Sequence, residues 1–228
     1  MRKLRDRIAG VAALNEPLRH KLYDFVSGHR GGVTRDDAAK ATGVARSVAA
    51  FHLDKLAEAG LVEVEFRRPA GRGGPGAGRP AKYYRRSSEE LSVSLPERRY
   101  DLSARILADA VENAEAQGRP IAQTVRDAAR RAGEGIAAQS AAPDAWNTDK
   151  LVEVLAENGY EPRRDGDSIT LDNCPFHALA DEHQELMCTM NLNLLTGLAH
   201  GAGLPRQALK LDPARGRCCV TLQARRAS

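Results

Sequence analysis

Apolar residues recur at helical spacing near the start of the chain. Leu18, Leu22 and Val26 form a stripe that follows Pro17 and ends at Gly28. Proline suits the first turn of a helix, and glycine suits the position after its end. This segment is therefore predicted to form the first helix of an N-terminal domain, preceded by a basic arm or an additional helical start.

Two shorter helices are predicted next, joined by a turn at Gly43. Thr34 stands three residues before Asp37, which is the pattern of a capping box at a helix N-terminus. The second helix, over about residues 45–59, carries apolar side chains at i, i+4 and i+7. These are Ala49, Leu53 and Leu56. Two helices joined in this way are typical of a helix-turn-helix motif.

A glycine-rich basic hairpin follows this helix pair. A strand over about residues 61–67 and a return strand through Tyr83 and Tyr84 flank a Gly/Pro-rich tip over residues 69–80. From Arg67 to Arg86 the hairpin has no acidic residue and seven basic ones, which are Arg67, Arg68, Arg72, Arg79, Lys82, Arg85 and Arg86. The layout predicts a winged helix-turn-helix that binds double-stranded DNA.

The polar face of the second helix is predicted to enter the major groove. Arg46 is expected to contact guanine, and Ser47 a phosphate or a base edge. Ala50 and Phe51 are expected to lie against thymine methyl groups. Phosphate contacts are expected from Lys55, Arg67, Arg68, Arg72 and Lys82. Arg79 is expected to enter a narrow minor groove. Solvation of Arg46 and packing of Phe51 under the wing are the alternatives for these two side chains.

These segments resemble a known family. The run Val44–Leu53, with Leu56 and Ala59–Val62 behind it, is similar to the recognition helix of ArsR-like winged-helix repressors. Gly78–Pro80 followed by Ala81–Tyr84 is similar to their wing. The resemblance covers roughly residues 15–90 and implies a winged-helix fold.

Helical periodicity continues over residues 96–140, with an interruption at Gly118–Pro120. The apolar stripes are Leu102, Ile106, Ala110, Val111, Ile121, Val125 and Ala129. Two such helices suit a dimer interface or a connecting stalk, or else pack on their own domain. We expect a homodimer, because helix-turn-helix regulators usually read two-fold sites with two-fold proteins.

The last part of the chain predicts a small α+β domain. After a linker near residues 141–147, the expected elements are a helix over 148–158, strands near 160–164 and 169–171, a long helix over about 178–201, and strands near 208–211 and 218–222. The predicted fold class is therefore α+β. The predicted regions are a winged helix-turn-helix domain (1–95), a helical linker or dimerisation region (96–145) and a cysteine-containing sensor domain (146–228).

Charge is distributed unevenly between the two halves. Residues 1–100 carry 20 basic and 12 acidic side chains, whereas residues 101–228 carry 14 and 18. A basic half joined to an acidic half indicates a polyanion-binding module attached to another domain, with random drift of surface charge as the alternative. No apolar run reaches the roughly 18–20 residues of a membrane span, and the basic N-terminus lacks the apolar core of a signal peptide. We therefore expect a cytoplasmic protein whose thiols stay reduced.

All four cysteines lie in the last quarter of the chain, at Cys174, Cys188, Cys218 and Cys219. Thiolates are soft ligands that suit iron–sulfur clusters, zinc or copper(I). Adjacent residues of a strand point to opposite faces, so the neighbouring pair is not expected to bind one centre together. His177, His183, a carboxylate or water is expected as a fourth ligand. The alternative is that the cysteines are buried as small apolar residues.

A second resemblance covers about residues 170–222. Asn173–Phe176, Cys188 and Gly216–Val220 are similar to the sensor half of repressors of iron–sulfur cluster assembly. The resemblance implies that three cysteines hold a cluster that controls DNA binding. It implies Cys174 and Cys188 as ligands, with Cys218 or Cys219 as the third.

The expected function is a DNA-binding transcriptional repressor controlled by a cysteine-ligated iron–sulfur cluster. The alternatives are a zinc- or thiol-redox-responsive regulator and a dimeric DNA-binding protein without a metal. An enzyme with Cys188 as nucleophile and His183 or His177 as base is not expected, because the sequence carries no catalytic motif that would mark it.

Overall fold

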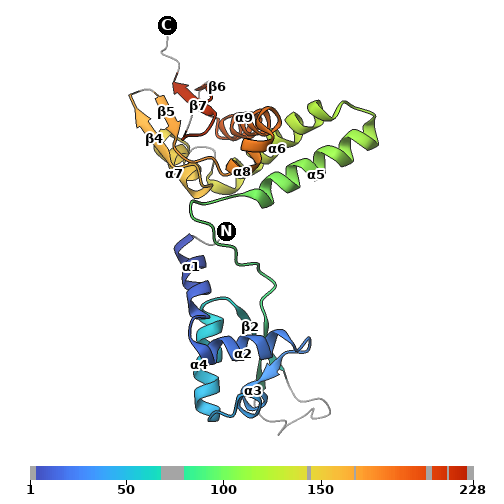
Figure 1. Ribbon diagram of the computed structural model, residues 1–228, viewed down its shortest axis with the longest axis vertical. Helices are drawn as coiled ribbons and strands as arrows, with labels where there is room; N and C mark the ends of the chain where they lie inside the picture. The colour runs from blue at the N-terminus through green and yellow to red at the C-terminus, as the bar shows by residue number, and fades with distance from the viewer. Residues whose placement is uncertain are drawn as a thin grey trace. The chain divides into compact units, whose positions relative to one another are not determined.

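A computed structural model describes residues 4–67, 80–142, 145–166, 168–203, 207–214 and 216–224. The chain divides into two compact units, Met1–Val93 and Ser94–Ser228 (Figure 1). Each unit has its own hydrophobic core. Among the described helices, none combines the length and hydropathy that a membrane span needs.

The first unit is a helical domain with a small antiparallel sheet. Its elements are α1 (Leu4–Ala13), α2 (Pro17–Ser27), β1 (Val33–Thr34), α3 (Arg35–Thr42), α4 (Arg46–Glu58), β2 (Val62–Arg67) and β3 (Ala81–Arg86). The strand order is β1-β3-β2. The helices and the two hairpin strands confirm the predicted helix-turn-helix and wing. β1 was not predicted, because a two-residue strand is too short to show an alternating pattern.

The turn between α3 and α4 forms as its residues predict. The Thr34 hydroxyl accepts a hydrogen bond from the Asp37 backbone N–H, and the Asp37 carboxylate accepts one from the Thr34 N–H. Gly43 ends α3 in the left-handed conformation, with φ of 70°, which favours glycine. Ala49, Leu53 and Leu56 of α4 are fully buried against the rest of the unit. The opposite face of α4 is thereby turned outward.

The second unit packs helices against a four-stranded antiparallel sheet. Its elements are α5 (Tyr100–Gln117), α6 (Ile121–Ser140), α7 (Thr148–Glu157), β4 (Pro162–Asp165), β5 (Ser168–Leu171), α8 (His177–Glu182), α9 (Gln184–Gly201), β6 (Gln207–Leu211) and β7 (Val220–Ala224). The strand order is β4-β5-β7-β6. The predicted long helix over 178–201 is interrupted at His183, which separates α8 from α9.

The helix α9 lies between the sheet and α6, and α5 lies beside α6 (Figure 1). The helices α6 and α9 approach so closely that a Cβ atom on Gly133 would stand 2.0 Å from the Leu194 carbonyl oxygen. A Cβ atom on Gly197 would stand 2.0 Å from the Arg130 carbonyl oxygen. The predicted helical region 96–145 and sensor domain 146–228 therefore share one core, because α6 finds its packing partner within its own unit.

Candidate DNA-binding surface and cysteine pocket

The outward face of α4 presents most of the side chains predicted to read DNA. Arg46, Ser47, Phe51 and Lys55 are exposed, and Ala50 is partly buried. Phe51 is 58% exposed, which is unusual for a large aromatic side chain. This face therefore offers an apolar contact beside polar groups at the N-terminal half of the helix, the part that reaches base edges in helix-turn-helix complexes.

The two basic residues of this face form ion pairs with acidic side chains at the surface. Arg46 Nε lies 2.5 Å from Asp36 Oδ1, and Lys55 Nζ lies 2.6 Å from Glu58 Oε2. Both pairs are solvent-exposed, and such pairs contribute at most about 1 kcal/mol. Arg46 is thus not left solvated alone, and its pair with Asp36 is weak enough for a nucleic acid to replace it.

Lys82 occupies a different environment from the one predicted for a phosphate contact. Its ammonium group is paired with the Asp54 carboxylate of α4, and the Tyr84 hydroxyl donates to the same oxygen over 2.7 Å. Burial tends to raise the pKa of Asp54, but the bonds from Lys82 and Tyr84 outweigh it and hold that pKa below its ordinary value. Burial tends to lower the pKa of Lys82, but the bond to Asp54 outweighs it and raises that pKa. The contacts of Asp54 with Lys82 and Tyr84, which we call the Asp54 clamp, hold the wing strand β3 against α4.

Asp54 was missed as a functional residue at the sequence level. The available signal was limited to Lys82 and Tyr84, which stand two residues apart on one face of a strand. The pairing of β3 with β2 and β1 determines which way the face with Lys82 and Tyr84 points. Only the folded structure shows that this face meets α4.

The wing arginines divide into described and undescribed positions. Arg67 donates to the Gly31 carbonyl over 2.8 Å and to Glu65 over 2.6 Å. Arg85 donates to Glu63 over 2.6 Å. Arg68, Arg72 and Arg79, which were predicted to bind the DNA backbone or minor groove, lie outside the described residues.

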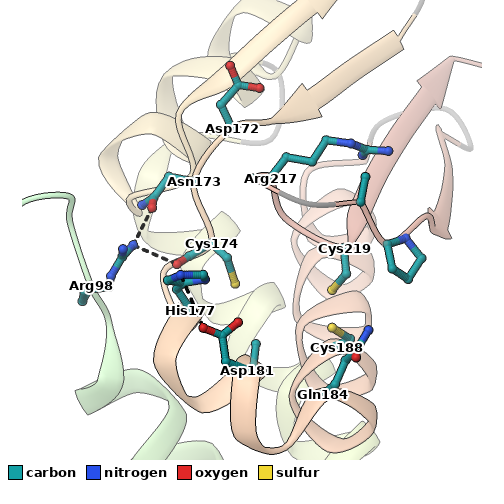
Figure 2. Close-up of a pocket in the computed structure, with 14 residues that line it drawn as sticks. Arg98, Asp172, Asn173, Cys174, His177, Asp181, Gln184, Cys188, Arg217 and Cys219 are labelled. Carbon is teal, nitrogen blue, oxygen red and sulfur yellow. Dashed lines mark hydrogen bonds and ion pairs between the residues drawn. The ribbon is translucent and has the colours of Figure 1, made fainter.

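The four cysteines meet in the second unit although they come from three separate segments. Cys174 follows β5, Cys188 lies on α9, and Cys218 and Cys219 directly precede β7 rather than lying on that strand. Three of them, Cys174, Cys188 and Cys219, line a cavity of about 740 Å³. Figure 2 shows their sulfur atoms directed into this cavity.

Cys218 is fully buried and is not among the residues that line the cavity. Its sulfur accepts a hydrogen bond from Asn191 Nδ2 over 3.1 Å, and Asn191 Oδ1 accepts one from the Tyr160 hydroxyl over 2.6 Å. Only Cys219 of the neighbouring pair therefore lines the cavity, although strand alternation is not the reason, because both residues precede β7.

The thiols interact pairwise in the order Cys174, Cys218, Cys219, Cys188. The interaction with Cys218, together with burial, raises the pKa of Cys174 far above its ordinary value. Cys174 lowers the pKa of Cys218, but Cys219 and burial outweigh it and raise that pKa to about 12. Burial raises the pKa of Cys188. These three thiols are therefore protonated at neutral pH.

The histidines considered as further ligands are placed differently. His177 lines the cavity and its Nε2 lies 3.5 Å from Asp181 Oδ2, with both side chains largely exposed. His183 is not among the residues that line this cavity. Within the described ranges, no three or more His, Cys, Asp or Glu side chains converge as the ligands of a single metal ion do.

Comparison with known proteins identifies part of the first unit. A family model described as a helix-turn-helix domain matches residues 14–65. The match spans α2, α3 and α4 and extends into β2, and it includes none of the second unit. No curated protein and no solved structure matches the chain. The chain therefore contains a helix-turn-helix domain, the type of domain that indicates a DNA-binding transcriptional regulator.

Proposed function

We propose that this protein is a transcriptional repressor whose operator binding is controlled by an iron–sulfur cluster in the cysteine pocket. The observation that carries the proposal is the combination of an exposed recognition helix in one unit with a three-cysteine cavity in the other. Neither feature is explained by stability alone, since Phe51 is left 58% exposed and the thiols surround a cavity of about 740 Å³ instead of closing on one another.

For DNA recognition, α4 enters the major groove with its N-terminal half facing the bases. Arg46 exchanges its contact with Asp36 for a guanine edge, and Phe51 lies against a thymine methyl group. Lys55 binds a phosphate and adds affinity without sequence information.

The test of this interface compares two basic residues on the same helix. Operator sequences selected from a random duplex pool are bound to the wild type, Arg46→Ala and Lys55→Ala. Arg46→Ala is expected to lose about 1–3 kcal/mol and to relax the preference at one base position. Lys55→Ala is expected to weaken all duplexes alike and to reduce the salt dependence of binding by about one counterion. Equal effects of both variants on every sequence would contradict the assigned roles.

The donor set of the cavity fits an iron–sulfur cluster. Cys174, Cys188 and Cys219 supply three thiols of the soft type that such clusters require, and they surround a broad space rather than a single point. Arg98 and Arg217 also line the cavity, and their positive charge favours the thiolates that ligation would create. When bound, a cluster would supply a redox-sensitive link between the three segments that carry these cysteines.

Zinc binding and reversible oxidation of the thiols are the alternatives to an iron–sulfur cluster in this cavity. The protein is purified without oxygen and analysed for visible absorbance, iron, acid-labile sulfide and zinc. Iron with sulfide supports the cluster, and zinc without sulfide supports the zinc-responsive alternative. A protein that contains no iron and no zinc supports a thiol sensor or a DNA-binding protein without a metal.

The residues that would hold the cluster are tested by serine variants. Cys174→Ser, Cys188→Ser and Cys219→Ser are expected to lose the absorbance and to change operator affinity. Cys218→Ser is the matched control, because Cys218 is absent from the cavity lining and a hydroxyl still accepts from Asn191. Retention of the absorbance in Cys219→Ser with its loss in Cys218→Ser would reverse the assignment of the third ligand.

The proposal includes a homodimer, because a two-fold operator is read by two recognition helices about 34–36 Å apart. Sedimentation of the purified protein with and without operator measures this directly. A monomer bound to a single half-site would remove the dimer from the proposal.

A further inference from the structure

The beginning of the second unit is bonded directly to the loop that carries Cys174. The second unit begins at Ser94, so the segment Glu97–Arg99 follows the first unit in the chain after only a few residues. The Arg99 backbone N–H donates to the Pro175 carbonyl over 3.0 Å. The Arg98 guanidinium donates from Nη1 to the Cys174 carbonyl over 3.0 Å and also to the Asn173 side-chain oxygen (Figure 2).

Asn173 completes this connection from the other side. Its side-chain nitrogen donates to the Glu97 carbonyl over 3.0 Å and to the Gly159 carbonyl over 2.5 Å. Asn173 is only 6% exposed, and a buried amide that makes all these bonds has little freedom to move alone. A change in the position of the Cys174 loop must therefore shift the segment Glu97–Arg99 or break several buried hydrogen bonds.

Cys174 itself links this network to the cavity. Its carbonyl oxygen accepts from Arg98, while its sulfur points into the space shared with Cys188 and Cys219. A ligand held by these three sulfur atoms would fix the position of the Cys174 loop relative to Cys188 and Cys219. The side chain of Cys174 thus lines the cavity, while its backbone carbonyl is bonded to the beginning of the second unit.

We propose that Arg98 and Asn173 are positioning residues that transmit a change in the position of the Cys174 loop to Glu97–Arg99, and from there through the connecting chain to the DNA-binding domain. This inference rests on the proposed function, since it needs a ligand in the cysteine cavity and an operator for the recognition helix. It places the coupling in a short connection of few residues, instead of in the long helices α5 and α6.

The guanidinium serves this role because one nitrogen, Nη1, donates to both the Asn173 side chain and the Cys174 carbonyl. A lysine ammonium carries the same charge on a flexible stem, but it does not reproduce the fixed geometry of the guanidinium. Arg98→Ala therefore removes both bonds, and Arg98→Lys retains the charge with part of the bonding. Arg105→Ala is the matched control, because Arg105 is an exposed arginine on α5.

The first measurement compares operator affinity with and without the cluster, together with iron and sulfide content and the absorbance spectrum. Coupling between two sites typically changes affinity by about 5- to 150-fold. We expect a ratio in this range for the wild type and for Arg105→Ala, a reduced ratio for Arg98→Lys, and a ratio near one for Arg98→Ala. Because Arg98 also lines the cavity, the ratio for each variant is taken from samples matched to the wild type in iron content and spectrum. A wild-type ratio in a cluster-loaded Arg98→Ala protein would overturn the inference and leave the proposed function intact.

The second measurement uses Zn²⁺ as a probe and does not depend on DNA. Alkylation shows whether Zn²⁺ protects the cavity thiols, and hydrogen exchange follows the amides of residues 97–103. In the wild type, Zn²⁺ is expected to change exchange at the Arg99 amide, which donates to Pro175, and in Arg98→Ala this change is expected to disappear. Protected thiols with unchanged exchange at this amide in the wild type would overturn the coupling alone. If neither Zn²⁺ nor a cluster protects the thiols, the proposed sensor fails and the inference fails with it.

Discussion

The recognition surface and the cysteine cavity are built on opposite electrostatic rules. Around α4 and the wing, the carboxylates of Asp37, Asp54 and Glu63 are held ionised by hydrogen bonds from neighbouring groups, which lower their pKa values. Around the cavity, neighbouring thiols and burial keep Cys174 and the adjacent Cys218 protonated by raising their pKa values. One site is therefore maintained by charges at the surface and the other by neutral groups in the interior.

This difference suits the two roles that we propose, DNA binding at the surface and ligand sensing in the cavity. Surface charges are weakly paired and exchange readily with phosphates and bases, so DNA binding needs no rearrangement of a core. Protonated buried thiols are poor nucleophiles and resist casual oxidation. A metal that displaces their protons must overcome that protection. Under the proposed function, the cavity therefore favours metals that bind thiolates strongly.

The largest expected effect is the protection of the cavity thiols from alkylation. The reactive species is the thiolate, and the ordinary pKa of a cysteine is about 8.5. Because the pKa of Cys218 is raised to about 12, its reaction with iodoacetamide at pH 8 is expected to be about 10³-fold slower than in the unfolded chain. Mass spectrometry of each cysteine-containing peptide against time measures these rates.

The same shift determines how the second unit responds to base. Between about pH 8.5 and the folded pKa, the unfolded chain releases thiol protons that the folded chain retains. Stability from Cys174 and Cys218 is therefore complete below pH 8.5 and falls as the pH rises above it. Rapid alkylation of Cys218 in the folded protein at pH 8 would show that the cavity is not built on neutral thiols.

The sequence predicted the local parts of both sites. The capping pair Thr34 and Asp37, and the stripe Ala49, Leu53 and Leu56, follow from spacing within a single helix, so periodicity alone located them. The prediction that strand ends and a long helix would bring the cysteines together also followed from element order.

Contacts between distant segments were beyond that reasoning. The Asp54 clamp depends on the face that β3 turns toward α4, and Arg98 meets Asn173 across 75 positions of sequence. The separate environments of Cys218 and Cys219 depend on where β7 begins. Periodicity defines the faces of an element but not the partner that each face meets.

An intermediate effect is expected at the crossing of α6 and α9, which supports the helix that carries Cys188. In Gly197→Ala, the new methyl group would stand 2.0 Å from the Arg130 carbonyl oxygen, so the helices must separate. Overpacking of this kind costs about 1–3 kcal/mol or more. Calorimetry is expected to show a lower unfolding temperature for the second unit, together with faster alkylation of Cys188.

The control for this crossing is Gly135→Ala on α6, where an added Cβ atom meets nothing within 4 Å. Alanine favours the helix over glycine by up to about 1 kcal/mol, so this variant is expected to be as stable as the wild type or more so. Equal stability of Gly197→Ala and Gly135→Ala would mean that the close approach of the two helices does not support the cavity.

The smallest expected effect concerns the clamp between the wing and the recognition helix. Asp54→Asn removes the charge that pairs with Lys82 but leaves an acceptor for the Tyr84 hydroxyl. Because the Asp54 side chain is half exposed, the loss at pH 7 is expected to be about 1 kcal/mol. Glu58→Gln breaks the exposed pair with Lys55 and is the control, with an expected change within about 0.5 kcal/mol.

The stabilising effect of the Asp54 clamp is expected to be lost in acid, whereas that of the cavity thiols is lost in base. The pKa of Asp54 is lower in the folded chain, so its stabilising effect is complete above the ordinary value of about 3.9 and is lost as the pH falls through the folded pKa. Urea unfolding at pH 7 and at pH 2.5 should therefore show a difference between wild type and Asp54→Asn that shrinks in acid. A difference that stays constant would indicate that Asp54 acts through its shape and not its charge. The contrast between an acid-sensitive recognition surface and a base-sensitive cavity would then no longer hold.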